Sequence, residues 1–311
     1  MSTALDTFLS HCNDDAGSIG AIRTLALVLR KSESTTMMGL GDELQEAANE
    51  IKMYVRKSSR IHVSMPVCSA CDFFLRTVTR VSREMLTSAD FDGIKDVLVK
   101  RGELLSRRLA SSRERVASFG KKFVGSGNTV LVHGTSRNVV SILKAASEEG
   151  RHFDVIVTEG RPDGAGYEMV RQLSEIGMPV KLVIDAAVGV VMEKVDLVIV
   201  GAEGIMENGG VTNKIGTAQI GSIARAHNVP MYVAAESFKF SRTYPLNQEE
   251  IQMMDSNRAQ DVVGGDKEDR NNVEHYLTDY TPPEYITLIF TDLGVMTPAA
   301  VSDELIKLYQ A

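Results

Sequence analysis

From residue 128 onward, short apolar runs alternate with amphipathic segments along the chain. The runs are dominated by Val, Ile and Leu, which is typical of strands buried on both faces of a sheet. Such alternation predicts a parallel sheet with helices on both faces. We expect strands at Val130–His133, Asp154–Thr158, Val180–Ile184, Leu197–Val200, Met231–Ala234 and Tyr285–Phe290, and helices at Asn138–Glu149, Tyr167–Ile176, Ile215–Asn228 and Pro298–Ala311.

The first part of the chain carries the apolar spacing of helices throughout. No strand pattern precedes residue 128, so we expect a helical bundle domain at residues 1–125 and an α/β domain at residues 126–311. Gly125-Ser126-Gly127 is the expected junction, and the polar stretch from Lys239 to Pro283 is expected to be irregular. The expected helices of the first domain are Ala21–Lys31, Gly41–Lys57, Pro66–Val78 and Phe91–Phe119.

Composition and charge argue against several classes of protein. No apolar run approaches the roughly 20 residues of a membrane helix, and the N-terminus lacks the pattern of a secretory signal. Three cysteines suit a reducing compartment, so we expect a cytosolic protein without a membrane partner. Residues 1–125 hold 19 Lys and Arg against 15 Asp and Glu, an excess too small, and too poor in interleaved aromatics, to indicate direct nucleic-acid binding. Solvated helix faces are the favoured explanation of this excess, since charge on helices usually serves solubility.

The loop after the first expected strand contains Thr135, Ser136 and Arg137 and leads directly into a helix. Free backbone N–H groups at a helix start, together with hydroxyls and a guanidinium, suit a phosphate or carboxylate. The alternative is that Thr135 or Ser136 caps the helix while Arg137 lies on the surface. Both interpretations stay open at this point.

Two further strand ends carry charged residues. Glu159 and Arg161 follow the second strand and either contact a ligand or pair with each other. Asp185 follows the third strand and either contacts a ligand or caps the next helix. These loops should meet at one edge of the sheet, because ligands of parallel sheets lie beyond the carboxyl ends of the strands.

The stretch Val195–Thr217 gives the strongest signal of a site. A buried strand delivers Glu203 to a glycine-rich loop, and Asn213 and Lys214 are expected to open the following helix. Burial would raise the pKa of such an acid and suit it to proton transfer, while an ammonium and an amide suit an anionic group. The alternative is a solvated acid between turn glycines.

Other chemistries find little support. Cys68 and Cys71 have half the spacing of a zinc site, but no second pair follows, so we expect core thiols and no metal. The chain has neither a Walker A loop nor a dinucleotide fingerprint, so no cofactor is expected. No assembled catalytic nucleophile is evident.

These motifs resemble the family that joins the alpha, beta and delta subunits of eukaryotic translation initiation factor 2B to the methylthioribose-1-phosphate and ribose-1,5-bisphosphate isomerases. The resemblance covers nearly the whole chain and implies a helical domain followed by a Rossmann-like domain. It is carried by Gly201-Ala202-Glu203, Asn208-Gly209-Gly210, Asn213-Lys214-Ile215-Gly216-Thr217, Glu159 and Arg161-Pro162.

Two departures separate the chain from the enzymes of that family. The enzymes place a cysteine directly after the histidine of the first strand and pair it with an aspartate, whereas this chain has Gly134 and Glu203 there. Glycine cannot move a proton, and a displacement of about 1 Å in the acid can cost roughly 100-fold in rate. The resemblance therefore implies a subunit without catalytic residues, and the competing hypothesis is a sugar-phosphate isomerase.

For such a subunit the resemblance also implies partners. It would pair with itself through the Rossmann-like domain and join the beta, gamma, delta and epsilon subunits of the exchange factor. Its helical domain would sense initiation factor 2 phosphorylated on its alpha chain, in keeping with the basic excess. The retained residues Asn213 and Lys214, with Thr135, Ser136, Arg137, Arg161 and Glu203, would bind a sugar phosphate or nucleoside monophosphate without turning it over.

Overall fold

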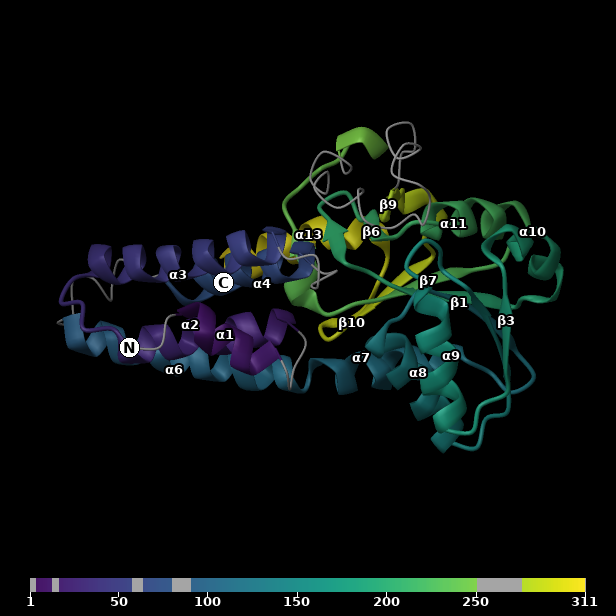
Figure 1. The fold of residues 1–311 in the computed structure, drawn as a ribbon, viewed down its shortest axis with the longest axis horizontal. Helices are drawn as coiled ribbons and strands as arrows, with labels where there is room; N and C mark the ends of the chain where they lie inside the picture. The colour runs from purple at the N-terminus through teal and green to yellow at the C-terminus, as the bar shows by residue number, and fades with distance from the viewer. Residues whose placement is uncertain (1–3, 13–16, 58–63, 80–90, 251–275, 311) are drawn as a thin grey trace, which may run out of the picture. The chain divides into compact units, whose positions relative to one another are not determined.

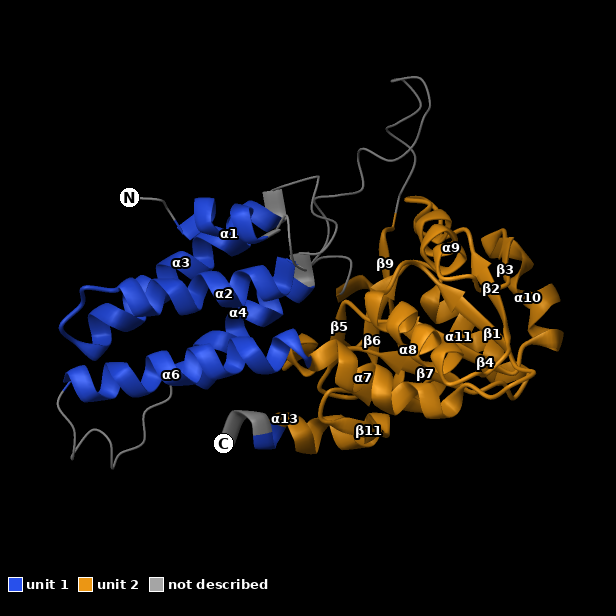
Figure 2. Cartoon of the chain, turned by 90° about the horizontal axis from the view of Figure 1, so that it is seen from below, with its two compact units in different colours: residues 1–111, 306–311 blue, residues 112–305 orange. Residues whose placement is uncertain are grey.

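The computed structural model describes the chain except for residues 1–3, 13–16, 58–63, 80–90, 251–275 and 311 (Figure 1). Residue contacts divide it into two compact units, residues 1–111 with 306–311, and residues 112–305 (Figure 2). The boundary between Ser111 and Ser112 lies before the junction that the glycine-rich sequence suggested at residues 125 and 126.

Unit 1 is helical, as predicted. Helix α2 packs against α1, α3, α4 and α6, and its fully buried Leu25 and Leu29 share the interior with Leu44, Ile51 and Phe74. The apolar spacing of the sequence thus corresponds to faces that are buried between helices. The bounds are α1 Ala4–Cys12, α2 Gly17–Lys31, α3 Met37–Lys57, α4 Ser64–Val78 and α6 Phe91–Ala110.

The helix expected at Phe91–Phe119 is two helices, α6 and α7, of which α7 spans Ser112–Gly120. Val116 and Ala117 of α7 are buried in the core of the sheet unit. A Cβ on Gly120 would lie 2.6 Å from Cδ1 of Ile142, so the end of α7 packs closely on that core. Helix periodicity shows which face is buried but not what covers it, which is why the sequence assigned α7 to the first domain.

Unit 2 is built on a seven-stranded sheet with the order β11-β10-β7-β4-β1-β2-β3. Every neighbouring pair is parallel except β10 and β11, which are antiparallel. The strand order reverses direction between β1 and β4, and this switch point is where ligands bind in open α/β sheets. The bounds are β1 Thr129–His133, β2 Asp154–Thr158, β3 Val180–Val183, β4 Leu197–Gly201, β7 Met231–Ala234, β10 Leu288–Thr291 and β11 Gly294–Met296.

Helices cover the large sheet, and the predicted α/β fold with a mostly parallel sheet is confirmed (Figure 1). Helix α8 packs against α7 and β4, α9 against β2 and β3, and α11 against β7. The α-helices are α8 Arg137–Glu148, α9 Ala165–Glu175, α10 Val188–Val191, α11 Thr217–Ala226 and α13 Val301–Gln310. The 3₁₀ turns are Lys121–Phe123, Asp185–Ala187, Met192–Lys194, Ser237–Lys239, Pro283–Tyr285 and Pro298–Ala300.

The sequence did not predict a second sheet, of order β8-β5-β6-β9. Asn213 and Lys214, expected to open a helix, instead end β6, which pairs antiparallel with β5 and β9. The stretch expected to be irregular supplies β8 and β9 at its ends, and its residues 251–275 lie outside the described part of the chain. The bounds are β5 Gly204–Met206, β6 Val211–Lys214, β8 Phe240–Ser241 and β9 Thr278–Thr281.

No helix among the described residues is both long and apolar enough to cross a membrane.

Replacing Gly166 by alanine is expected to destabilise the fold by about 3 kcal/mol. A Cβ at this position would lie 1.9 Å from the carbonyl oxygen of Thr158, because α9 begins directly against the end of β2. Gly41→Ala is the control, since Gly41 lies in α3 with nothing within 4 Å of its Cβ position. Urea unfolding at one protein concentration measures both changes, and equal effects would contradict the close approach.

Candidate functional site

Polar side chains meet at the carboxyl ends of β1, β2 and β4, beside the end of β6. Lys214 lies at the centre of this cluster. Its Nζ is 2.8 Å from Oδ2 of Asp163 and 3.9 Å from Oε1 of Glu203. The side chains of Lys214, Asp163 and Glu203 are only 20%, 21% and 13% exposed. One ammonium therefore lies among two carboxylates in a partly desolvated place at the switch point of the sheet.

The second sheet explains why Lys214 reaches this cluster. Antiparallel pairing with β9 holds β6 so that Lys214 lies opposite Thr278. Asn213, just before it, is buried, and its Nδ2 donates to Oγ1 of Thr217 at 3.1 Å. The Thr217 hydroxyl donates in turn to the carbonyl of Lys214 at 2.6 Å. Asn213 thus fixes the junction between β6 and α11, and the ammonium of Lys214 is the group that faces the cluster.

His133, at the end of β1, is buried beside Lys214. Its Nε2 lies 2.8 Å from the carbonyl oxygen of Ile215, which can only accept, so this nitrogen donates. Its Nδ1 lies 2.5 Å from Oγ1 of Thr158. Burial lowers the pKa of His133. The neutral imidazole of His133 has a hydrogen-bonding partner at each ring nitrogen, so it links the end of β1 to Thr158 and Ile215 and positions them.

The loop from Gly134 to Arg137 follows His133 directly. Ser136 is the N-cap of α8, and its Oγ accepts from the Val139 N–H, which is the capping role that the sequence left open. The hydroxyl of Thr135 donates to the carbonyl oxygen of Ala165, and Thr135 and Arg137 are exposed. Gly134 has φ +66°, and a Cβ there would lie 3.3 Å from Cγ of Lys214. The loop thus borders the Lys214 cluster.

The loop after β2 carries the remaining predicted charges. Nε of Arg161 lies 3.2 Å from Oε2 of Glu159, so the two residues pair with each other, and the Arg161 side chain is 64% exposed. Asp185 accepts from the backbone N–H groups of Gly160 and Arg161 at 2.9 and 2.7 Å. Asp185 therefore holds the loop whose next acid, Asp163, contacts Lys214.

Sequence reasoning missed two acids near this site. Asp163 follows Pro162 in the loop for which the sequence predicted roles only for Glu159 and Arg161. Asp279, on β9, accepts from the backbone N–H groups of Gly216 and Ala218 at 2.8 and 3.0 Å, at the start of α11. Burial raises the pKa of Asp279 to about 7, against the effect of these donors. Since the partners lie more than 60 positions away along the chain, only the fold could reveal this contact.

Asp279→Asn is expected to become more stable relative to the native chain as pH rises from about 5 to about 8. Because the pKa is about 7 when folded and about 3.9 when unfolded, the folded protein keeps a proton that the unfolded chain releases. Stability therefore falls as pH rises through this window, and an asparagine escapes that loss. Urea unfolding at both pH values tests this, with exposed Asp154→Asn as the control; a difference independent of pH would contradict it.

Among the residues that the structure describes, no group of three or more His, Cys, Asp and Glu could hold a metal ion. Cys68 and Cys71, noted as half of a zinc spacing, lie on α4, and neither is in a disulfide. Cys71 is buried, and burial raises its pKa to about 12, so this thiol stays protonated and belongs to the helical core.

The fold and the cluster define a class: a Rossmann-like α/β protein with a charged site at the switch point and a helical unit before it. The chain belongs to the initiation factor 2 subunit family, whose model matches residues 13–298. This confirms the family inferred from the motifs.

Similarity to known proteins extends over nearly the whole chain. It is 46% identical to translation initiation factor eIF2B subunit alpha of Dictyostelium discoideum and 37% identical to that of Caenorhabditis elegans, each over 94% of this chain and over 91% and 92% of the relative. It is 34% identical to a ribose 1,5-bisphosphate isomerase of Thermococcus kodakarensis, over 93% of this chain and 88% of the enzyme. Among solved structures, the tetrameric eIF2B beta–delta complex of C. thermophilum shares the fold with TM-score 0.75 at 18% identity, covering 98% of this chain and 93% of the other.

Proposed function

We propose that the chain is the regulatory alpha subunit of translation initiation factor 2B, a cytosolic guanine-nucleotide exchange complex. The observation that carries this proposal is the 46% identity, over 94% of the chain, to a protein named as that subunit. The subunit joins the beta, gamma, delta and epsilon subunits, has no exchange activity of its own, and mediates inhibition by initiation factor 2 phosphorylated on its alpha chain. Residues 1–125 hold four more basic than acidic residues, and a phosphorylated partner favours basic surfaces.

The cluster around Lys214 is proposed to bind a sugar phosphate or nucleoside monophosphate without converting it. Lys214 holds the carboxylate of Asp163 at 2.8 Å, so an incoming phosphate would exchange for that carboxylate. Thr135, Ser136 and Arg137 at the start of α8, and Arg161 on the neighbouring loop, would complete the contacts. Glu203 lies within reach of Lys214, but the residue after His133 is Gly134, which offers no group for proton transfer.

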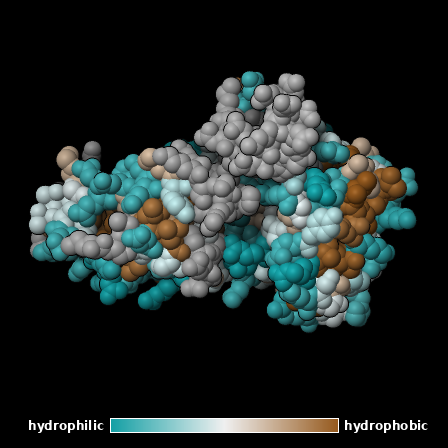
Figure 3. Space-filling model, viewed as in Figure 1, coloured by the Kyte–Doolittle hydropathy of each residue, from teal (hydrophilic) through white to brown (hydrophobic). Residues whose placement is uncertain are grey.

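The homodimer is proposed to form along β3, the last strand of the large sheet. Leu182 and Ile184 are 38% and 59% exposed, and Val190 of α10 is 76% exposed. In Figure 3 a brown, hydrophobic area covers the side of unit 2 where Figure 1 places β3 and α10. An open strand edge with apolar side chains is prone to pair. In a dimer with two-fold symmetry the same patch of both copies forms the interface, so the apolar side chains of one copy would face those of the other.

Reconstitution tests the proposed function. The chain is expected to co-purify with the beta, gamma, delta and epsilon subunits and to strengthen their binding to initiation factor 2 phosphorylated on its alpha chain. Subunit stoichiometry after gel filtration, followed by binding measurements with and without the chain, provides both readouts. Equal binding of the phosphorylated factor in the two cases would refute the regulatory role.

An isomerase remains the competing function, because the chain is also 34% identical to a ribose 1,5-bisphosphate isomerase. We expect no turnover of ribose 1,5-bisphosphate or methylthioribose 1-phosphate by the purified chain. The positive φ of Gly134 would strain a cysteine at that position. Measurable turnover that disappears in Glu203→Gln would establish the enzyme and overturn the non-catalytic interpretation of the site.

A further inference from the structure

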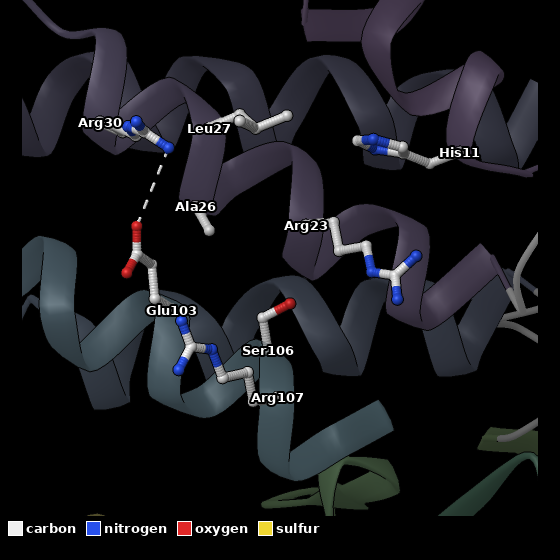
Figure 4. Close-up of a pocket in the computed structure, with 8 residues that line it drawn as sticks. All are labelled: His11, Arg23, Ala26, Leu27, Arg30, Glu103, Ser106 and Arg107. Carbon is white, nitrogen blue, oxygen red and sulfur yellow. Dashed lines mark ion pairs between the residues drawn. The ribbon is translucent and has the colours of Figure 1, made fainter. Parts of the chain in front are cut away.

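The ion pair between Glu236 and Lys239, just after β7, is deeply buried. Nζ of Lys239 is 3.1 Å from Oε2 of Glu236, and the two side chains are only 17% and 6% exposed. An exposed pair such as Arg30 and Glu103, 4.0 Å apart at the hollow of unit 1 (Figure 4), contributes little to stability. A buried pair carries a desolvation cost, and neutral residues of similar volume often stabilise a fold as well or better. Stability alone therefore does not explain Glu236 and Lys239.

The groups around this pair connect the ends of two neighbouring strands. Nδ2 of Asn138, in the first turn of α8, donates to Oε2 of Glu236 at 2.8 Å, and Asn138 is buried. Nζ of Lys239 also donates to the carbonyl oxygen of Ala202 at 2.9 Å, and Ala202 directly follows β4. One ammonium therefore ties the segment after β7 to the backbone after β4, at the edge of the sheet where the candidate site lies.

The bond to Ala202 bears on the candidate site, because the next residue is Glu203. The N–H of Glu203 donates to the carbonyl oxygen of Thr212 on β6 at 2.8 Å. The backbone at Ala202 and Glu203 is thus held from two sides, by Lys239 and by the small sheet. These two bonds set how far the Glu203 carboxylate reaches toward Lys214.

The position of Glu203 decides how open Lys214 is to a phosphate. Oε1 of Glu203 is 3.9 Å from Nζ of Lys214, whereas Oδ2 of Asp163 is 2.8 Å from the same nitrogen. Hydrogen bonds between an ammonium and a carboxylate are about 2.7 to 2.9 Å long, so of these two acids only Asp163 bonds directly to Lys214. A Glu203 carboxylate at the same distance would be a second group that the phosphate must displace.

We propose that Lys239 is a positioning residue of this site: through the Ala202 carbonyl it holds Glu203 back from Lys214 and leaves that ammonium open to a phosphate. The inference rests on the proposed phosphate site and adds to it a residue that acts without touching the ligand. When the bond from Lys239 is lost, Glu203 closes on Lys214, because opposite charges attract strongly in a partly desolvated place.

The test removes both charges of the buried pair, in a chain that carries Lys239→Met and Glu236→Gln. No uncompensated charge then stays buried, so the variant is expected to fold, and circular dichroism checks this. Isothermal titration is expected to show binding of ribose 5-phosphate at least about 10-fold weaker than in the native chain.

The matched control is the ion pair of Lys52 and Asp72 between α3 and α4 of the helical unit. Its two charged atoms are 2.6 Å apart, and the Lys52 side chain is 15% exposed, much like that of Lys239. Lys52→Met with Asp72→Asn is expected to leave the binding of ribose 5-phosphate unchanged. An equal loss in this control, or unchanged binding in the variant of Lys239 and Glu236, would overturn the proposal.

Adding Glu203→Gln to Lys239→Met and Glu236→Gln distinguishes positioning from general damage. A neutral amide does not compete for Lys214, so this triple variant is expected to bind ribose 5-phosphate within about threefold of Glu203→Gln alone. Binding as weak as in the variant without Glu203→Gln would show that Lys239 does not act through Glu203, and would overturn the proposal.

A measurement without ligand separates the role of Lys239 from the phosphate site itself. In urea unfolding, the coupling between Glu203→Gln and Lys214→Ala is expected to be larger in the background of Lys239→Met and Glu236→Gln than in the native chain, since the two charges are then in direct contact. Equal couplings would overturn the positioning role. Absence of ribose 5-phosphate binding by the native chain would refute the phosphate site and leave the coupling to decide whether Lys239 holds Glu203.

Discussion

Replacing Ile184 by lysine is expected to weaken self-association of the chain at least about 100-fold. The proposed two-fold contact buries Ile184 from each copy, so one substitution places two uncompensated ammonium groups in an apolar interface. A buried charge that is left uncompensated costs about 3 to 5 kcal/mol. Every 1.4 kcal/mol of binding free energy changes the dissociation constant about tenfold. The monomer should stay folded, because the side chain is 59% exposed in the single chain.

A matched control comes from Leu104, which is also 59% exposed but lies on α6 in the helical unit. Leu104→Lys is expected to leave self-association unchanged. Sedimentation equilibrium of the native chain and both variants measures the difference. A dimer that persists in Ile184→Lys would move the contact away from the β3 edge.

Lys214→Ala is expected to weaken binding of ribose 5-phosphate or adenosine monophosphate by about 10- to 100-fold, since hydrogen bonds to charged groups contribute about 1.5 to 3 kcal/mol. Asp163→Asn should act in the opposite direction. Its carboxylate lies 2.8 Å from Lys214 and competes with the phosphate, so its neutralisation is expected to tighten binding. Opposite signs at two contacting residues distinguish anion exchange from general damage.

Lys144→Ala is the control for lost positive charge, because Lys144 is 55% exposed on α8 and faces Glu148. Lys144→Ala is expected to bind ribose 5-phosphate and adenosine monophosphate like the native chain. Isothermal titration of all four proteins gives the affinities. Unchanged binding in Lys214→Ala, or weaker binding in Asp163→Asn, would contradict phosphate recognition by this lysine.

The large sheet was predictable because its strands are buried on both faces. Runs such as Leu197–Val200 consist of aliphatic side chains, and the strand β4 extends that run by a single residue, Gly201. Amphipathic helices between such runs leave few alternatives to a parallel sheet. The strand expected at Tyr285–Phe290 was placed too early, because the chain first makes a 3₁₀ turn at Pro283–Tyr285.

The small sheet was not predictable by the same signal. Its strand β6 reads Val-Thr-Asn-Lys and is short and polar, so its residues fit a helix start as well as a strand. Pairing with β5 and β9, the latter far along the chain, decides the matter. The local sequence pattern does not predict such long-range strand pairing.

The site likewise combines residues that were predictable from the sequence with residues that were not. Glu203 and Lys214 were expected in one pocket and lie 3.9 Å apart. Asp163 was overlooked, since its importance comes only from its contact with Lys214, 51 positions later. Asn213 was expected to contact a ligand, yet its amide holds Thr217 at the junction of β6 and α11.

The proposed function requires that the chain make guanine-nucleotide exchange sensitive to phosphorylation of initiation factor 2. GDP release from initiation factor 2 can be measured with a complex of the beta, gamma, delta and epsilon subunits, with and without this chain, in the presence of factor phosphorylated on its alpha chain. We predict strong inhibition with the chain, little inhibition without it, and no exchange by the chain alone. Equal inhibition with and without the chain would contradict the proposed function.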